Sequence, residues 1–369
     1  MSLRRALPLL AAVAVAGAVV GIALSGANLA AVGKALARTR PQWLAAAFAL
    51  MIAAFLLRAF SWREVLRAAL PTAVRPPFPA VVRAAMIGVM GSAVLPGRLG
   101  EPARTLLLAR RLPGRPSRTI PLVAGTLLSQ TVMNLIALGL LAVATFSSIS
   151  VFSGREAGLI GGAAVAAAAV ALIGAGPSLL RLASRSRSRL LARAAAVGSR
   201  LLADARRGLS VFAKPRHGLP AVFFQLGAWA LQWLSCDAVL HALRLQHKAG
   251  LVAAAAVLLA VNVSAILPPT PSNVGIFQAA CVLVLSAFGI GAAAGLAYGF
   301  ALQGVEFFTA LLLGVPALLA EGMGWRELRE AAAKEQELLG GGGDSEQEQK
   351  GAHRAAVGTN QARDGNRNP

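Results

Sequence analysis

The sequence predicts an all-α, polytopic membrane protein, and three observations lead to this class. Hydrophobic residues make up 56% of the 369 residues, charged residues only 14%, and the mean hydropathy is +0.65. Soluble domains carry about 25% charged residues, so this composition is atypical of them. Apolar runs near the length that crosses a bilayer recur along the chain. Prolines and glycines interrupt two further apolar regions, which is unusual for plain spanning helices.

Six full spans are expected from the apolar runs, at about 6–25, 41–60, 119–146, 157–176, 219–240 and 293–320. The first run also has features of a signal peptide, but it is long for one, so a retained span is preferred. Two interrupted regions, about 80–95 and 249–290, are each expected to enter the membrane and return to the same side. Because paired interruptions that enter from opposite faces are typical of inverted-repeat transporters, we expect an inverted repeat with its site near the bilayer midplane.

The formal net charge of +21 indicates cytoplasmic loops rather than a nucleic-acid surface, and no nucleic-acid partner is expected. The arginines lie mostly between apolar runs, no aromatic platform alternates with them, and the positive-inside rule accounts for such cations. Arg4 and Arg5 precede the first span, and Arg58 and Arg63 are among the cations that follow the second. Both flanks are therefore expected in the cytoplasm. Arg58, with Trp62 and Arg63, is interpreted as an anchor whose charge snorkels to the interface.

One membrane domain is expected over residues 1–320, followed by a tail over 321–369. Within the domain, residues 177–217 contain ten Lys and Arg against one acid and are expected to form a basic cytoplasmic loop. The tail begins with a short helical pattern and continues into a polar run that is expected to be disordered in the cytoplasm. Cys236 and Cys281 have no CxxC spacing, and the histidines have no metal-ligand spacing, so no cofactor or metal is expected.

The stretch 95–104, with the sequence LPGRLGEPAR, places one acid and two arginines beside a backbone break. Glu101 lies between a glycine and a proline, which suits the first turn of a helix. In a helix Arg98, Glu101 and Arg104 share a face, because they are three residues apart. Glu101 is therefore expected to hold one arginine while the other binds an anion, for which a lipid phosphate is the candidate. In the alternative interpretation the arginines only mark the cytoplasmic boundary and Glu101 neutralises one of them.

The second interruption, residues 267–275 with the sequence LPPTPSNVG, carries no charge. It offers hydrogen bonds only, from Ser272, Asn273 and the backbone groups freed near its prolines and Gly275, and Gln278 follows. Polar side chains within the other apolar runs fit contacts between helices as well as the lining of a pathway. They are Gln130, Thr131, Asn134, Gln225, Gln232, Asn262, Gln303 and Glu306.

Three stretches resemble a known family of membrane proteins. They are LPGRLGEPARTLLLARR at 95–111, LPPTPSNVGIFQAACVLVLSAFGI at 267–290 and LRAFSWREVL at 57–66. The resemblance is to the flippase-like transmembrane family, which is also the membrane domain of lysylphosphatidylglycerol synthases, and it covers roughly residues 8–320. It implies a multi-pass protein of the bacterial inner membrane that moves, or helps to move, a phospholipid or polyprenyl-linked lipid between leaflets. It also implies that residues of the first motif line a cavity: Gly97, Arg98, Gly100, Glu101 and Arg104.

The chain departs from the family pattern at several charged positions. Where family members commonly carry a Glu-Arg pair and an Asp in the middle span, this sequence has Gln130, Thr131 and Asn134. Where they commonly carry a Glu after the second motif and an Arg in the last span, it has Gln278 and Gln303. Neutral side chains of similar shape retain hydrogen bonds, so the fold is expected to persist. A mechanism that uses those charges, such as proton coupling, is in doubt.

Three functions follow from these features as expectations. The first is non-enzymatic translocation of an anionic lipid, whose headgroup Arg98 and Arg104 hold while Glu101 positions them. The uncharged second half also fits a membrane partner or scaffold of a separate lipid-modifying or glycosyltransferase enzyme. An enzyme in its own right would need Glu101, Asp237 and His241 to meet in space. The residues expected to contact the lipid are Gly97, Arg98, Gly100, Glu101, Arg104, Gln130, Asn134, Pro268, Ser272, Asn273, Gly275, Gln278 and Gln303.

Overall fold

The computed structural model describes residues 29–71, 74–94, 100–113, 116–148, 210–264 and 275–322. Within these ranges every regular element is a helix and no residue lies in a β-strand, which confirms the all-α class. The helices are α2 (Leu29–Ala37), α3 (Pro41–Ala69), α4 (Phe78–Val94), α5 (Gly100–Ala109), α6 (Pro116–Ser148), α9 (Ser210–Ala213), α10 (Pro215–Ala242), α11 (Leu251–Ser264), α12 (Ile276–Ser286) and α13 (Ala292–Ala320).

Among the described helices, α3, α6 and α13 are long and apolar enough to cross a bilayer. They coincide with the spans predicted at 41–60, 119–146 and 293–320. The run predicted at 219–240 lies within the 28-residue α10. The runs at 6–25 and 157–176 lie outside the described residues, as do residues 177–209 of the basic loop and the tail from residue 323.

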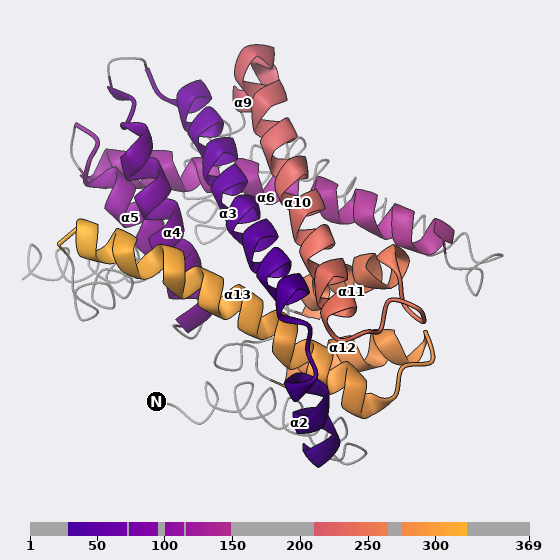
Figure 1. Cartoon of the computed structure of the whole chain (residues 1–369). Coiled ribbons are helices and arrows are strands. Elements are labelled where there is room, and N and C mark those ends of the chain that lie inside the picture. The colour runs from indigo at the N-terminus through magenta and orange to yellow at the C-terminus, as the bar shows by residue number, and fades with distance from the viewer. Residues whose placement is uncertain are drawn as a thin grey trace, which may run out of the picture.

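Helices α3 and α10 lie side by side and run in opposite directions through the middle of the described structure (Figure 1). The Oγ of Ser61 donates to the carbonyl oxygen of Ala221 at 2.9 Å, and the Oγ of Ser235 donates to that of Ala47, also at 2.9 Å. At one end of the pair, Lys214 donates to the carbonyl oxygen of Ala68 at 2.6 Å. Small hydroxyl residues that bond to a neighbouring backbone let two helices approach closely, so Ser61 and Ser235 hold this pair together without using a charge.

The first interrupted region consists of α4 and α5, which pack through glycines. A Cβ on Gly100 would lie 1.9 Å from the carbonyl oxygen of Gly88 and 2.4 Å from the backbone nitrogen of Ser92. A Cβ on Gly88 would lie 2.7 Å from the Cδ of Arg104. Because a real Cβ cannot approach this closely, glycine is required at Gly100 for packing.

The second interrupted region consists of α11 and α12. Gly275 caps the start of α12 with a φ of 94°, a conformation that favours glycine, and its N–H donates to the Oε1 of Gln278 at 2.7 Å. Helix α12 then packs on the first half of α13 at two glycines. A Cβ on Gly295 would lie 3.1 Å from the Cα of Val282, and one on Gly299 would lie 3.2 Å from the Cα of Gln278.

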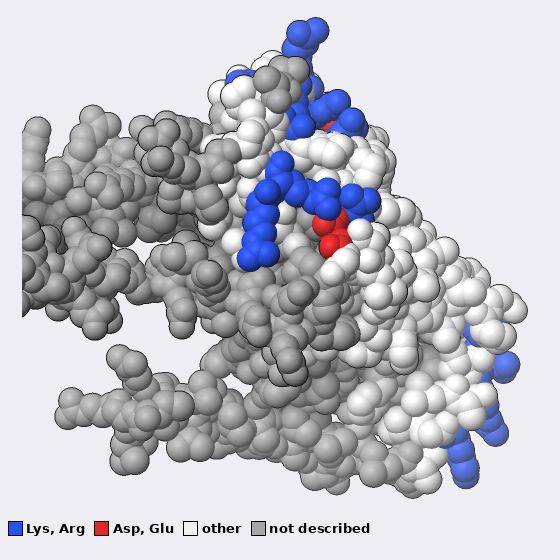
Figure 2. All heavy atoms as spheres, turned by 90° about the vertical axis from the view of Figure 1, so that its left-hand side faces the viewer, with Lys and Arg blue, Asp and Glu red and all other residues white. Residues whose placement is uncertain are grey.

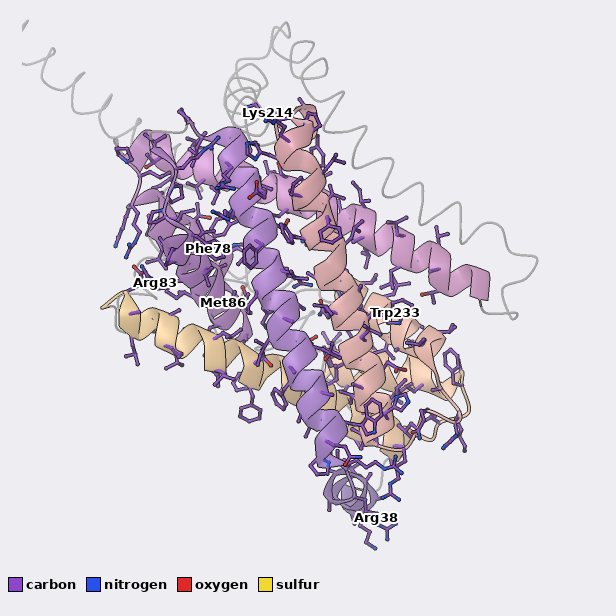
Figure 3. The ribbon with its side chains drawn as sticks, turned by 45° about the horizontal axis from the view of Figure 1, so that its top comes forward. Arg38, Phe78, Arg83, Met86, Lys214 and Trp233 are labelled. Carbon is purple, nitrogen blue, oxygen red and sulfur yellow. The ribbon has the colours of Figure 1, made fainter. Side chains whose placement is uncertain are left out.

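The two interrupted regions lie against different halves of α13. Arg83 near the start of α4 and Arg111 just after α5 both pair with Glu321, at the C-terminal end of α13. Figure 3 shows Arg83 beside that end. In contrast, α12 leads directly into the N-terminal end of α13, and α11 begins where Trp233 of α10 donates to the carbonyl oxygen of Leu251 at 2.8 Å. The start of α4 and the end of α5 therefore lie together at the C-terminal end of α13, whereas the end of α12 lies at its N-terminal end.

Lys and Arg side chains gather in two groups on the described surface, with uncharged surface between them (Figure 2). Lys214 and Arg38 lie at the two ends of the α3–α10 pair (Figure 3). We call the end of the pair that carries Lys214 the Lys214 end. Its cations are Arg63, Arg67, Arg75, Arg83, Arg110, Arg111, Lys214 and Arg216. The group at the Arg38 end comprises Lys34, Arg38, Arg40, Arg244 and Lys248.

Glu321 ties the α4–α5 hairpin to the end of α13. Its carboxylate accepts a hydrogen bond from the Nε of Arg83 at 2.6 Å and another from Arg111, while only 8% of the side chain is exposed. Burial by itself would raise the pKa of Glu321, but the bonds from the two arginines outweigh it and lower the pKa below its ordinary value.

Acidification is therefore expected to weaken the fold through Glu321. Because its pKa is lower in the folded state, its contribution to stability is complete above the unfolded-state pKa of about 4.3 and is lost as the pH falls through the folded-state pKa. Glu321→Gln should remove this part of the pH dependence and cost about 1–2 kcal/mol at neutral pH. Thermal unfolding in detergent, from neutral pH through the acidic range, measures both the pH dependence of stability and the loss at neutral pH. Identical pH dependence in the wild type and the variant would contradict the assignment.

Candidate functional site

Polar side chains from four helices meet near the helix midpoints. Arg58 lies three residues past the middle of α3, and Glu306 is the middle residue of α13. Gln232 of α10 joins them, because its Oε1 accepts a hydrogen bond from Arg58 and its Nε2 donates to Glu306 at 3.4 Å. Gln130 of α6 donates to the carbonyl oxygen of Arg58 at 3.4 Å. We call Arg58, Gln232 and Glu306 the central network.

The guanidinium of Arg58 lies between aromatic rings. Its Cζ is 5.8 Å from the ring centroid of Trp229 and 6.0 Å from that of Phe55. The residue is half-buried, whereas its Nε is shielded from solvent and has no hydrogen-bond partner among the described residues. A shielded N–H without an acceptor costs free energy, and an anionic acceptor would recover it. Arg58 therefore combines a cation, an unused donor and partial access.

The interpretation of Arg58 as an interfacial anchor is wrong. Helix α3 continues nine residues beyond the predicted end of its apolar run at residue 60, as far as Ala69. Arg58 therefore lies near the middle of the helix instead of at its boundary. Trp62, the other expected anchor, is fully buried, and its Nε1 donates to the hydroxyl of Thr126 at 3.0 Å.

The described half of the first motif faces the same region. Glu101 and Arg104, one turn apart on α5, form an ion pair, which confirms that Glu101 holds an arginine. The guanidinium of Arg104 lies 5.0 Å from the ring centroid of Trp62, which is one helical turn from Arg58 on α3. Arg58 interacts electrostatically with Glu306, Arg104 and Glu101. The side chain of Arg104 is 14% exposed and that of Glu101 51%, so the acid is the more accessible member of the pair.

The neutral second motif reaches the network from the other side. The Nε2 of Gln278 donates to the Oε1 of Gln303, while the Oε1 of Gln278 caps α12 at Gly275. Gln303 and Glu306 share a face of α13, because they are three residues apart. Polar side chains of α5 and of α12 therefore lie within about one helical turn of the central network along α3 and α13. The hydrogen bonds of Gln278 hold helices together, and only 2% of the residue is exposed.

Two further predicted site residues have identifiable partners. Gln130 is bound to the backbone of Arg58, as described above. The Oδ1 of Asn134 accepts hydrogen bonds from the Nε2 of Gln225 at 2.6 Å and from the Nε1 of Trp229 at 3.0 Å. Both residues of α6 therefore position the α3–α10 pair around Arg58. The remaining predicted residues lie outside the described ranges, namely Gly97, Arg98, Pro268, Ser272 and Asn273.

Sequence reasoning left Arg58, Gln232 and Glu306 out of the candidate site. Gln232 and Glu306 were expected only as either contacts between helices or a pathway lining, and Arg58 as an anchor. All three residues lie near the midpoints of their helices. This position along the helix is the signal that would have identified them as site residues. Charges at such a depth are costly and mark functional sites by default. An apolar run does not show where its helix ends, so the midpoints were misplaced.

Glu101 lies apart from Asp237 and His241 in the described structure. His241 lies 3.3 Å from Asp237 and stacks on Trp43 with ring centroids 4.4 Å apart. Trp62, whose ring lies beside Arg104 of the Glu101–Arg104 pair, is 19 residues further along α3 than Trp43. At 1.5 Å per residue the two tryptophans are about 28 Å apart along the helix. Among the described residues no group of three His, Cys, Asp or Glu side chains could hold a metal ion.

Comparisons with known proteins place the chain in one family. No curated protein matches it significantly. The family model described as the lysylphosphatidylglycerol synthase TM region matches residues 9–314. The matched range includes the described helices from α2 to α12 and α13 as far as residue 314. This match agrees with the membrane class indicated by the three long apolar helices. The chain belongs to the lysylphosphatidylglycerol synthase transmembrane-region family.

Proposed function

We propose that the central network binds the anionic headgroup of a phospholipid or polyprenyl-linked lipid, and that the protein moves this lipid, or helps to move it, between the leaflets of the bacterial inner membrane. Arg58 is the observation that carries the proposal. A cation near the middle of a spanning helix is expensive in hydrocarbon and is retained where it meets a substrate or a partner. Its unused Nε donor and partial exposure favour a substrate.

The contacts of Arg58 leave its charge available. Gln232 stands between Arg58 and Glu306, and the described contacts include no direct ion pair between the two charged residues. The amide of Gln232 uses one nitrogen of the guanidinium and carries no charge that would neutralise it, and the shielded Nε remains as a donor for a phosphate. Arg104, one helical turn away across Trp62, supplies a second cation along the same route.

The helix arrangement supports alternating access. The α4–α5 pair lies against the C-terminal half of α13 and α12 lies against its N-terminal half, as the two re-entrant elements of an inverted repeat would. Of the described cations assigned to the two ends, eight lie at the Lys214 end and five at the Arg38 end. The positive-inside rule then places the Lys214 end, and with it Glu321 and the following tail, in the cytoplasm. The α4–α5 pair and the α11–α12 pair would open alternately to the two sides of the membrane around the central network.

A leaflet-resolved lipid assay tests the proposal. The purified protein in vesicles should accelerate exchange of labelled phosphatidylglycerol between leaflets more than that of zwitterionic phosphatidylcholine. Arg104→Gln should slow this exchange about tenfold, equivalent to about 1.4 kcal/mol of lost headgroup interaction. Arg244→Gln removes a cation at the Arg38 end, far from the network, and should leave the rate unchanged. A lipid distribution identical with and without protein, for every anionic headgroup offered, would sink the proposal.

The neutral contact between Gln278 and Gln303 favours a second function, in which the protein is a membrane partner of a lipid-modifying or glycosyltransferase enzyme. In that function the hydrogen bond between Gln278 and Gln303 only holds α12 against α13. Copurification of such an enzyme, together with unchanged lipid distribution in vesicles, would favour this partner role. A translocation defect in Arg104→Gln with normal enzyme binding would count against it.

A further inference from the structure

A basic hollow of about 170 Å³ lies between the last turns of α3 and the start of α4, outside the central network. Three arginines line it, Arg63 and Arg67 from α3 and Arg75 from the connection, together with Phe78. We propose that this hollow binds the phosphate of an anionic phospholipid headgroup at the Lys214 end of the protein. The site is independent of the translocation proposed above, since none of its residues belongs to the network.

Among the residues that the structure describes, the three guanidinium groups keep most of their donors free for such a ligand. Arg67 uses one nitrogen to bind Glu64 at 2.9 Å, and Arg75 uses one to bind the carbonyl oxygen of Arg67 at 2.9 Å. Arg63 lies over the ring of Phe78, with its Cζ 4.8 Å from the centroid. The Nε of Arg75 is shielded from solvent and has no partner. Each guanidinium carries five N–H donors in a fixed plane, which matches the geometry of phosphate oxygens.

The local charge also favours an anion. Glu64 pairs with Arg67, and it is the one carboxylate among the described side chains that contacts any of the three arginines; its second oxygen is 3.0 Å from the Nδ1 of His217. Three cations against one acid leave an excess of two positive charges around the hollow. A phosphodiester headgroup would compensate part of that excess.

The backbone around the hollow holds it ready for a ligand. Pro76 and Pro77 follow Arg75 directly, and a residue before proline is restricted to extended conformations. The ring of Phe78 is also fixed from its other neighbour, Phe60, with ring centroids 4.6 Å apart. Because these restrictions precede binding, little ordering free energy is needed when the anion arrives.

The depth of the hollow indicates a lipid rather than a soluble anion. Helix α3, with 29 residues, is about 43 Å long, whereas the hydrocarbon core of a bilayer is about 30 Å thick. With that core centred on the middle of α3, Arg67 lies beyond it at the headgroup level, and Arg63 lies just inside its edge, where a long side chain extends to the headgroups. The side chain of Arg67 is 37% exposed, so the hollow is reached from outside the helix pair.

Thermal unfolding of the full chain in a neutral detergent tests the site with three probes: phosphatidylglycerol, phosphatidylcholine and inorganic phosphate. A ligand that binds only the folded state raises the unfolding temperature according to its affinity. Phosphatidylglycerol should stabilise the wild type, and Arg63→Gln/Arg75→Gln should weaken this lipid at least tenfold. The matched control Arg244→Gln/Lys248→Gln removes two cations at the Arg38 end and should bind as the wild type does.

The outcomes separate the sources of the phosphate. A smaller phosphatidylglycerol shift in Arg63→Gln/Arg75→Gln than in the wild type and the control supports the lipid site, since the central network is intact in all three. An equal shift with inorganic phosphate, lost in the same variant, would overturn the lipid assignment in favour of a free anion. A full shift with both anions in the double variant would overturn the site itself. If that variant does not fold, Arg63→Gln alone provides the comparison, because the contact of Arg63 is with the ring of Phe78 and not with the backbone.

Discussion

Replacement of Arg58 by glutamine is expected to abolish lipid translocation and to lower the free energy of unfolding by about 1.5–3 kcal/mol, the usual contribution of a hydrogen bond to a charged group. The cation compensates Glu306 through Gln232 and contacts the rings of Phe55 and Trp229. Without it, Glu306 remains in a low-dielectric environment without a counter-charge. Denaturant titration in mixed micelles measures the stability, and the vesicle assay measures transport.

The double variant Arg58→Gln/Glu306→Gln separates the structural role of Arg58 from its functional one. Removing both charges leaves glutamines able to bond to Gln232, so stability should return close to that of the wild type. Translocation should stay absent, because the headgroup still lacks its cation. Wild-type transport by the stable double variant would show that the central network holds helices together and does not contact the lipid.

Gly100→Ala should destabilise the protein by about 1–3 kcal/mol or more and displace α5, carrying Glu101 and Arg104 away from Trp62. The new methyl group would lie 1.9 Å from the carbonyl oxygen of Gly88, a backbone atom that cannot rotate away. Overpacking of this kind is relieved only by moving one helix relative to the other. Unfolding in detergent measures the loss of stability, and the rate of leaflet exchange reports the displaced arginine.

Gly304→Ala provides the matched control for this prediction. Gly304 lies inside α13, and a Cβ added there would meet nothing within 4 Å. Alanine should therefore be neutral or stabilise α13 by about 0.5–1 kcal/mol through its higher helix propensity. Equal behaviour of the two variants would mean that the contact between α4 and α5 is looser than the structure indicates.

The class of the protein and the place of its two interruptions could be predicted from composition and from Pro and Gly positions. These are local properties, because any helix in hydrocarbon needs an apolar run and any run with several prolines must break. The pairing of Glu101 with Arg104 was also predictable, since three residues on one helix form a fixed spacing. The roles of Gly100 and Gly275 were not, because close approach and a positive φ are set by neighbouring segments.

The sequence by itself determined an all-helical membrane protein, with two broken helical regions and one charged motif that resembled a known family. Only the tertiary structure decided that Arg58, Gln232 and Glu306 form one network, because these residues lie on three helices far apart in the sequence. A charge in an apolar run has the same appearance in the sequence at a helix end and at a helix midpoint. The physical difference is the length of the helix around it and the side chains that neighbouring helices bring to it.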